Sequence, residues 1–554
     1  MTQTVKKTLR DSAGMRWTAL LLLALAMFCS YVFMDILSPI KDLMQETRGW
    51  DSAAFGRMQG AEVFLNVYVF FLIIAGIILD KMGVRFTAVL SGAVMLIGGI
   101  IKFYAVTDGF DATPLGQWFT NNLNWDGDIP IIGTILPFAD GMPGSAKLAA
   151  IGFMLFGSGC EMAGITVSRG IVKWFKGRET ALAMGSEMAL ARLGVATCMI
   201  FAPFFAKLGG EVHVDNAVKF GVVLLCIALI MFIVYFFMDK KLDSQTGEAE
   251  EKDDPFKISD LGKIFTSLGF WLVALLCVLY YSAIFPFQKY AVNMLQCNLT
   301  LNPADPSTYW GGSTEGFPIS VTVVQYIIML IVAVCSFSSN FSKKKGMKYG
   351  LMCLAIVALV IYCYMGYMRG TAETIFAVFP LLAVAITPIL GNYVDHKGKA
   401  ASMLMLGSIL LVVCHLTFAF ILPEFKGNTV GGTVVAYVTI LVLGASFSLV
   451  PAALWPSVPK LVDEKIIGSA YAAIFWIQNI GLGLFPTLIG IVLQKTNAEG
   501  TAAHELDYTW ALVMLAVLGI AALLISIYLK AVDKKKGYGL EEPNIKPEEK
   551  PAQA

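Results

Sequence analysis

Long apolar blocks separated by short polar segments run through the chain from end to end. Most blocks are about twenty residues long, the length that a helix needs to cross the hydrocarbon layer of a bilayer. The first block follows a basic segment and has no small-residue cleavage site, so it predicts a retained span and no signal peptide. The pattern predicts an all-α polytopic membrane protein with about fourteen spans. The predicted spans are residues 17–36, 61–79, 86–104, 149–168, 180–207, 218–238, 269–295, 319–337, 349–368, 372–390, 402–422, 433–455, 467–493 and 508–529.

Basic residues in the polar segments predict the orientation of the spans. When both chain ends are placed in the cytoplasm, most Lys and Arg fall in cytoplasmic segments, as the positive-inside rule requires. The long segment 106–147 then lies outside, and it is acidic with few basic residues. Removing any single span would reverse the orientation of every later span, so the charge pattern favours an even number of spans. The basic residues expected inside include Lys81, Arg85, Lys173, Lys176, Arg178, Lys343, Lys344, Lys345, Lys348, Lys397, Lys399, Lys460, Lys465, Lys534, Lys535 and Lys536.

A charged segment at residues 239–268 divides the chain into two membrane parts. Its polar run contains Glu248 and Asp254 and ends at Pro255. Such a composition predicts a cytoplasmic linker. The linker would join an N-terminal six-helix half to a C-terminal half, and a cytoplasmic tail would follow. The predicted boundaries are 1–238 for the first half, 269–530 for the second and 531–554 for the tail.

Composition agrees with a membrane protein and excludes several other classes. Apolar residues make up 57% of the chain and charged residues 15%, and the mean hydropathy is +0.70. Soluble proteins carry roughly 25% charged residues. A net charge of +1 gives no reason to expect nucleic-acid binding. The ten cysteines and four histidines form no ligand cluster and the chain has no enzyme motif, so we expect no metal, no cofactor, no disulfide framework and no enzyme.

A short motif occurs twice, each time in a predicted inner loop. Both copies read G-x-x-x-D and continue with basic residues around a glycine. We expect the first glycine to allow close helix contact and the aspartate to accept hydrogen bonds from a neighbouring helix N-terminus. The basic residues would anchor the loop, and the whole would act as a conformational lock. The copies comprise Gly76, Asp80, Lys81, Gly83 and Arg85 after the second span, and Gly391, Asp395, Lys397 and Gly398 after the tenth.

This repeated motif resembles the inner-loop signature of the major facilitator superfamily. The resemblance implies two related six-helix halves and transport by alternating access. Twelve spans are usual for that superfamily, and the second half here holds two more. We expect them to form an inserted helical hairpin within residues 296–370, joined by the basic turn at Lys343, Lys344 and Lys345. A peripheral scaffold is the favoured interpretation of this hairpin, and a partner-binding role is the alternative.

Several further segments resemble one branch of that superfamily, the lysosomal dipeptide uniporters of animals and their bacterial relatives. They include residues 159–161, 173–179, 191–194, 280–287, 453–456, 468–471 and 477–482. The resemblance implies that Glu161 of the fourth span and Arg192 of the fifth hold the two ends of a peptide. No acidic dileucine sorting motif precedes the first span. We therefore expect the cell inner membrane, with both termini cytoplasmic.

Charged residues within spans provide an independent physical argument for the same site. They are costly in a bilayer and usually line a cavity or pair with each other. Counting from the inner loop places Glu161 and Arg192 at a similar depth near the midplane, where carriers hold their substrates. The guanidinium of Arg192 suits a carboxylate, and Glu161 suits an ammonium. The alternative is a permanent ion pair that joins the two helices.

Other polar residues within spans have two interpretations each. Tyr280 or Tyr281, and Gln478 or Asn479, could line the site, or could pack between helices. Adjacent positions lie about 100° apart on a helix, so at most one residue of each pair should face the site. We interpret Asp35 and Glu62 as ordinary polar span ends and His415 as a hydrogen-bonded core histidine. Together with Glu187 they could also titrate during transport.

The leading hypothesis is a secondary carrier for dipeptides or similar zwitterions, acting as a monomer in the lipid bilayer. A carrier or exchanger of small organic anions is the first alternative, because Arg192 alone could bind a carboxylate. A membrane sensor that binds without transporting is a remote alternative.

Overall fold

The computed structural model is helical throughout the part that it describes, with no strand there. It describes residues 8–125, 133, 136–176, 178–246, 258–299, 321–342, 344–462 and 467–544. Within these residues, thirteen helices are long and apolar enough to cross a membrane. The predicted acidic run of the linker, the loop before the hairpin and Lys343 lie outside the described residues.

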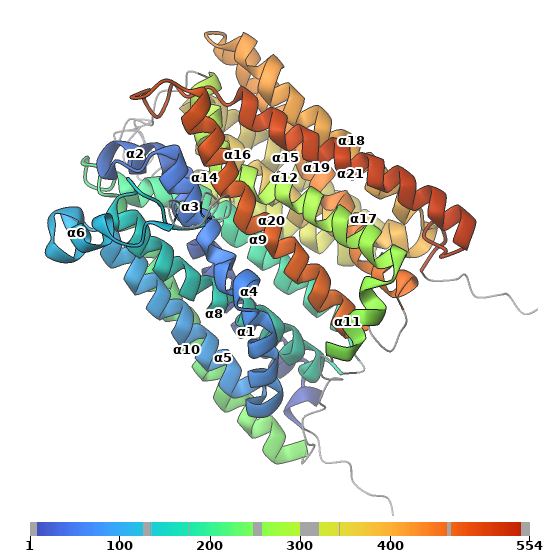
Figure 1. Cartoon of the computed structure of the whole chain (residues 1–554). Coiled ribbons are helices and arrows are strands. Elements are labelled where there is room, and N and C mark those ends of the chain that lie inside the picture. Colours follow the sequence, from blue (N-terminus) through green and yellow to red (C-terminus); the bar gives the residue numbers. More distant parts are fainter. Residues whose placement is uncertain are drawn as a thin grey trace, which may run out of the picture.

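The N-terminal half is a bundle in which helices from distant parts of the sequence pack side by side. The first span, α1, packs against α9 and α10, and α5 packs against α8 and α10. The short helix α3, which precedes the second predicted span, contacts α8 and also α20 of the other half. In Figure 1 this bundle is the one labelled α1, α5, α8 and α10. The bounds are Ala13–Met34 for α1, Lys41–Arg48 for α2, Ser52–Gly60 for α3, Phe64–Tyr68 for α4, Phe71–Ala105 for α5, Pro114–Asn121 for α6, Gly144–Trp174 for α8, Thr180–Ala206 for α9 and Val214–Thr246 for α10.

The second predicted span explains why thirteen long helices appear and not fourteen. Its residues 61–79 are divided among a 3-10 turn at Ala61–Val63, α4 and the first part of α5, and α3 directly precedes them. Phe70 adopts a left-handed conformation, with φ 55°, at the break before α5. Gly83 interrupts α5 with φ 79° and ψ 166°, and the third predicted span follows it. A side chain is strained at that φ, so this turn requires its glycine. The chain still crosses the bundle twice in this region.

The C-terminal half repeats the arrangement with its own helices. Here α12 packs against α19, α20 and α21, and α18 packs against α19 and α21. The prolines at 286, 388, 451, 456, 459 and 486 stay inside helices, which membrane helices tolerate when neighbours satisfy the freed carbonyls. The bounds are Ile258–Phe265 for α11, Leu268–Leu299 for α12, Ala372–Phe376 for α16, Val378–Lys397 for α17, Ala400–Leu416 for α18, Thr429–Leu461 for α19, Ile467–Thr496 for α20 and Thr509–Lys536 for α21.

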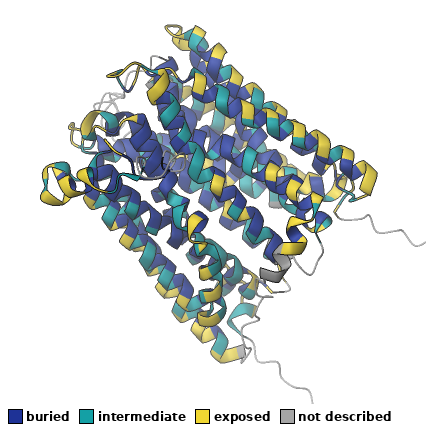
Figure 2. Cartoon of the chain, in the orientation of Figure 1, coloured by how far each residue is buried: buried dark blue, intermediate teal, exposed yellow. Residues whose placement is uncertain are grey.

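The two additional helices, α14 (Val321–Phe341) and α15 (Lys345–Arg369), form an antiparallel hairpin as the sequence predicts. The hairpin packs on the outside of the bundle, mainly through α14, which contacts α17 and α9. Many apolar side chains of α15 are exposed, including Val360 at 62% and Tyr364 at 62%. These faces are suited to lipid, and Figure 2 shows exposed residues along the outer helices of the whole bundle.

The segment after α21 folds back on the second half. Leu540 is fully buried, and Glu541 accepts a hydrogen bond at 2.8 Å from the backbone N–H of Ser402 near the start of α18. The Lys460 ammonium donates to the Gly539 carbonyl at 2.9 Å. The residues predicted as a cytoplasmic tail therefore include the end of α21 and a docked segment up to Asn544.

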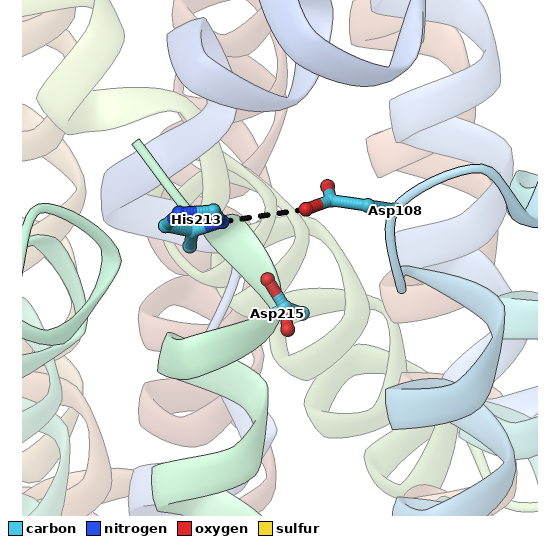
Figure 3. A group of neighbouring side chains, drawn as sticks. All are labelled: Asp108, His213 and Asp215. Carbon is cyan, nitrogen blue, oxygen red and sulfur yellow. Dashed lines mark hydrogen bonds and ion pairs between the residues drawn. The ribbon is translucent and has the colours of Figure 1, made fainter. Parts of the chain in front are cut away.

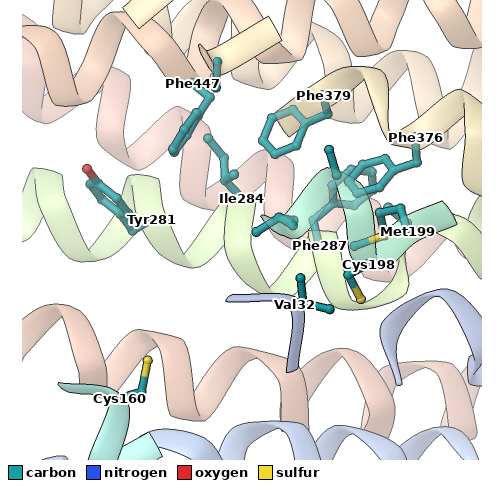
Figure 4. Packing of buried hydrophobic residues seen from close by; sticks show 14 of the residues in the cluster. Val32, Cys160, Cys198, Met199, Tyr281, Ile284, Phe287, Phe376, Phe379 and Phe447 are labelled. Atoms are coloured by element: carbon teal, nitrogen blue, oxygen red, sulfur yellow. The ribbon is translucent and has the colours of Figure 1, made fainter. Parts of the chain in front are cut away.

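The helix bundle has two ends, which we call the basic end and the far end. The basic end carries α11, the end of α8 and the end of α21, and it lies at the lower right of Figure 1. The far end carries α2 and α6. Buried rings from different helices fill the second half between these ends, as Figure 4 shows for Phe287, Phe376, Phe379 and Phe447. Phe376 and Phe379 stack with centroids 5.5 Å apart.

Glycines bring the two halves into close contact toward the far end. A Cβ added at Gly60 of α3 would collide with the Gly483 carbonyl of α20, and one added at Gly56 would collide with the Pro486 carbonyl. Small residues allow membrane helices to approach in this way. The contact between α3 and α20 is therefore a seam of backbone against backbone.

Gly60→Val should favour a conformation in which the far end is open. Overpacking of about 1–3 kcal/mol should lower the population of the closed seam about 5- to 150-fold. Spin labels at the exposed residues Thr47 and Glu505, one on each half, would report the separation by pulsed EPR. The exposed cysteines Cys226 and Cys353 would first be replaced by serine.

Gly350→Val is the matched control, because a Cβ added at Gly350, an exposed residue of α15, meets no atom within 4 Å. It should leave the distance distribution as in the wild type. An unchanged distribution in Gly60→Val would contradict the role of this seam in closing the far end.

Candidate functional site

Two charged side chains lie at a similar depth on adjacent helices of the first half. Glu161 is 13 residues before the end of α8, and Arg192 is 12 residues after the start of α9. At ~1.5 Å per residue, both are roughly 20 Å from the basic end of their helices. Both side chains are half-buried. A charge at this depth that keeps partial exposure indicates a hydrated space and not a lipid contact.

Glu161 faces the second half. Its Oε1 accepts a hydrogen bond from Nδ2 of Asn479, on α20, at 3.3 Å. Its other oxygen has no partner among the described residues. Asn479 is only 2% exposed, so the amide is held by its surroundings and orients the carboxylate. The contact joins the halves at the level of the two charges.

Arg192 also faces the second half, where aromatic rings surround it. Its guanidinium carbon lies 5.0 Å from the ring centroid of Phe447 and 5.2 Å from that of Phe285, and Tyr31 of α1 is 5.9 Å away. Rings at such distances attract a cation through their faces. Among the described residues the guanidinium forms no hydrogen bond or ion pair. In this conformation Glu161 and Arg192 thus do not form the permanent pair considered above.

As the helical spacing predicts, only one residue of the tyrosine pair (Tyr280 and Tyr281) and one of the amide pair (Gln478 and Asn479) lies toward the two charges. Tyr280 is fully buried and its hydroxyl lies 2.6 Å from Ser446 Oγ within the second half. Tyr281 stacks on Phe285 with centroids 5.4 Å apart, so it is the member near Arg192. Gln478 accepts from the Cys277 thiol at 3.2 Å and faces its own half. Only one residue of each pair therefore lies toward the two charges.

Three site residues escaped the sequence analysis because they carry no charge. Tyr31, Phe285 and Phe447 lie on α1, α12 and α19, which meet around Arg192. Such rings are common in apolar spans, and only contact with the guanidinium distinguishes these three. Glu187 is buried, at 7% exposure, on the same helix as Arg192.

A buried ammonium connects the halves nearer the far end. Lys289 of α12 lies 3.0 Å from Asp35 Oδ1 and 3.3 Å from Glu62 Oε2. Gln288 donates a further hydrogen bond to Asp35 Oδ2 at 2.6 Å. The exposed fractions of the Lys289 and Asp35 side chains are 8% and 1%. The interpretation of Asp35 and Glu62 as ordinary polar span ends was therefore wrong, because Lys289 was not recognised as their partner.

Polar contacts extend this cross-half connection to the far end. Lys41 Nζ donates to Asn293 Oδ1 at 3.1 Å, and Gln296 donates to Asp42 at 3.1 Å. The Tyr290 hydroxyl donates to the Ser52 carbonyl at 3.2 Å. Together with the glycine seam, these contacts close the far end in this structure.

A second buried lysine lies beside this cluster. Lys102 of α5 is fully buried, and its Nζ has no hydrogen-bond partner among the described residues. The ammonium lies 3.6 Å from the ring centroid of Phe153, and the Lys289 ammonium lies 5.6 Å from the same ring. Two cations of different halves thus share one aromatic ring.

The first copy of the repeated motif forms ion pairs within its own half. Asp80 accepts from Arg169 of α8 at 2.7 Å, so its partner is a side chain and not the expected helix N-terminus. Arg85 pairs with Asp243 of α10 at 3.1 Å. Lys81 is exposed. No atom lies within 4 Å of a Cβ added at Gly76, so the expected close helix contact is absent here in this conformation.

The second copy uses the folded-back C-terminal segment instead. Asp395 accepts from Asn544 at 2.9 Å. A Cβ added at Gly398 would collide with the backbone of Glu541 and Glu542, whereas one added at Gly391 would meet no atom within 4 Å. Lys397 is exposed.

His415 agrees with its interpretation as a core histidine. It is fully buried in α18, and its Nε2 lies 3.0 Å from the Ala283 carbonyl. That prediction is confirmed.

A further polar cluster lies at the far end, where Asp108, His213 and Asp215 approach one another (Figure 3). Their potential ligand atoms lie within 4.8 Å of one another. Asp108 already binds the Arg48 guanidinium, and His213 Nδ1 lies 3.3 Å from Asp108. The hydrogen bond from Arg48 holds the pKa of Asp108 below its ordinary value. The cluster therefore connects the loop after α5 to α10, and a metal would have to displace Arg48.

Comparison with known proteins identifies the family. The sequence model of the Major Facilitator Superfamily matches residues 23–372. The chain belongs to the major facilitator superfamily. The resemblance inferred from the repeated motif is thus confirmed, and this carrier is a multi-pass membrane protein.

Curated relatives within the superfamily are similar over most of their length. The lysosomal dipeptide transporter MFSD1 of Danio rerio is 24% identical over 426 residues, which cover 76% of this chain and 74% of the relative. MFSD1 of Homo sapiens is 23% identical over 402 residues, covering 71% and 69%.

Solved structures of superfamily members share the fold. The nucleoside transporter NupG has a TM-score of 0.57 at 11% identity, over 92% of this chain and 99% of NupG. A structure of a proton-dependent oligopeptide transporter has a TM-score of 0.53 at 11% identity, over 94% and 99%. The predicted fold class is therefore confirmed.

Lys289→Met should open the far end and lower the thermal stability of the closed state. It leaves Asp35 and Glu62 buried without their cation, and removing one partner of a buried pair costs about 3–5 kcal/mol. The label pair at Thr47 and Glu505 should show a larger separation, and the melting temperature in detergent should fall.

Lys289→Arg is the matched control, because it retains the charge. It should restore most of the closed population. A closed distance distribution in Lys289→Met would show that the ion pairs do not hold the halves together.

Proposed function

We propose that this carrier moves dipeptides or similar zwitterions by alternating access. The observation that supports the proposal best is the arrangement of Glu161 and Arg192. The two side chains have opposite charges, lie at the same depth, do not pair with each other and both face the other half. The relatives named as lysosomal dipeptide transporters support the same class of solute.

The chemistry of the two groups suits the two ends of a peptide. A carboxylate can accept two parallel hydrogen bonds from the guanidinium of Arg192, which presents its donors in a fixed fork. An ammonium can donate to the free oxygen of Glu161, while Asn479 holds the other oxygen. The rings of Phe285, Phe447 and Tyr31 offer apolar walls for side chains between the two ends.

The same geometry supports an alternating-access cycle. The far end is closed by Lys289, the polar contacts and the glycine seam, so exposure of the two charges points to access from the basic end. Release of Lys289 from Asp35 and Glu62 would open the opposite path. Placing the basic end in the cytoplasm follows the positive-inside rule. We propose the cell inner membrane as the location, with both termini cytoplasmic.

Arg192→Lys should greatly weaken dipeptide uptake while the protein stays folded. Lysine keeps the charge but loses the fork of donors, and hydrogen bonds to charged groups contribute roughly 1.5–3 kcal/mol. The half-saturating dipeptide concentration in proteoliposomes should rise about ten- to hundredfold. Uptake equal to the wild type would remove Arg192 from the site.

Glu161→Gln should discriminate between the ends of the substrate. It should weaken binding of a dipeptide with a free amino group more than binding of its N-acetylated form. Thermal shift with purified protein would report both affinities, since a ligand that binds only the folded state raises its melting temperature. An equal loss for both peptides would place the amino group elsewhere.

Competition by dicarboxylates tests the organic-anion alternative. If dicarboxylates displace labelled dipeptide and are transported, and Glu161→Gln leaves their transport intact, the carrier is an organic-anion transporter. Lys535→Gln, an exposed charge change at the basic end, is the control for both variants.

A further inference from the structure

A cavity lies between the inserted hairpin and α17. Its volume is about 190 Å³. Its lining is apolar apart from two serines, and the Ser339 hydroxyl already donates to the Ser336 carbonyl at 2.7 Å. A cavity with this lining offers too few polar partners to hold ordered water. The lining includes Val332, Met352, Ala355, Leu359, Leu382 and Ile386.

The cavity borders the lipid-facing surface of the bundle. Ile356 and Ile389 belong to its lining and are 58% and 44% exposed. They lie on α15 and α17, so both walls continue onto the outer face of the protein. In a membrane, this face is surrounded by acyl chains, and the most accessible occupant of the cavity is therefore a hydrocarbon chain.

The lining of α15 continues into a row of lysines at the basic end. Met352, Ala355 and Leu359 recur at helical spacing on one face of α15. Lys348 and Lys345 precede Met352 by four and seven residues and continue the same face. Along the helix they lie about 6 Å and 10 Å beyond Met352, where the headgroups of a bilayer begin.

The charges of this lysine row are not neutralised within the described part of the protein. Lys344, Lys345 and Lys348 are exposed, and their side chains form no ion pair there. Lys397, at the facing end of α17, is exposed as well. Exposed cations of two helices thus follow the apolar cavity toward the basic end, a combination that matches an anionic headgroup attached to an acyl chain.

We propose that the hairpin and α17 form a binding site for an anionic phospholipid. One acyl chain occupies the cavity, and the phosphate contacts Lys345 and Lys348. The lipid fills the space between the inserted hairpin and the superfamily core, which explains why the hairpin packs there without a complete protein interface. This site is separate from Glu161 and Arg192 and does not rest on the proposed substrate.

Native mass spectrometry of the full-length protein in detergent would test the site. The protein would be delipidated and incubated with phosphatidylglycerol or phosphatidylcholine with the same acyl chains. The wild type should retain phosphatidylglycerol selectively. The double variant Lys345→Gln, Lys348→Gln should reduce its affinity roughly thirtyfold, since each lysine near a headgroup contributes about a factor of five.

A second variant tests the cavity itself. Ala355→Phe should occupy the space of the acyl chain and abolish the retained lipid while both lysines remain. If this variant fails to fold, the lysine variant still decides the proposal. The control is Lys535→Gln, Lys536→Gln, which removes the same charge from the end of α21 and should bind lipid as the wild type does.

Three results would overturn the proposal. They are equal retention of the two lipids by the wild type, undiminished phosphatidylglycerol binding by the lysine variant, and a protein dimer in place of the lipid complex. The last result would show that a second copy of the chain covers the cavity.

Discussion

The conformation described here depends on one buried cation held between two carboxylates of the opposite half. Lys289 contacts Asp35 and Glu62 where water is nearly excluded, so none of the three can be exposed to lipid or separated cheaply. The glycine seam and the polar contacts nearby are short-range and require the halves to be in register. The ammonium defines that register, and the position of Glu161 and Arg192 relative to the second half follows from it.

Much of the fold could be predicted from the apolar blocks, because each span has to satisfy its backbone internally and must be long enough to cross the bilayer. The inserted hairpin and the two halves were predicted from the number of apolar blocks and from the distribution of charged residues. The turn at Gly83 agrees with the predicted loop between the second and third spans, whereas the break at Phe70 could not be predicted, since it depends on local backbone conformation. Lys289 was missed because a pairwise contact between spans far apart in sequence leaves no periodic signal in either span.

In the candidate site, too, features that depend on the local sequence could be predicted, whereas those that depend on tertiary packing could not. Glu161 and Arg192 were identified because charges are rare in spans, and helical spacing allowed only one member of each polar pair to face them. Which member does so depends on helix rotation, and only the packing of α12 and α20 settles that. The aromatic environment of Arg192 comes from three helices and was invisible in the sequence. A cation among rings keeps its hydrogen-bond donors available, which a salt bridge would not.

The two copies of the repeated motif contact different parts of the chain, and this difference affects where the protein can be split into fragments. The first half uses Arg169, a residue of its own bundle, whereas the second half depends on Asn544 and Glu541, which follow its last membrane helix. An autonomous second half therefore extends beyond the bilayer boundary at α21. Split versions of the chain, co-expressed as two fragments, would need the residues up to Asn544 to be complete.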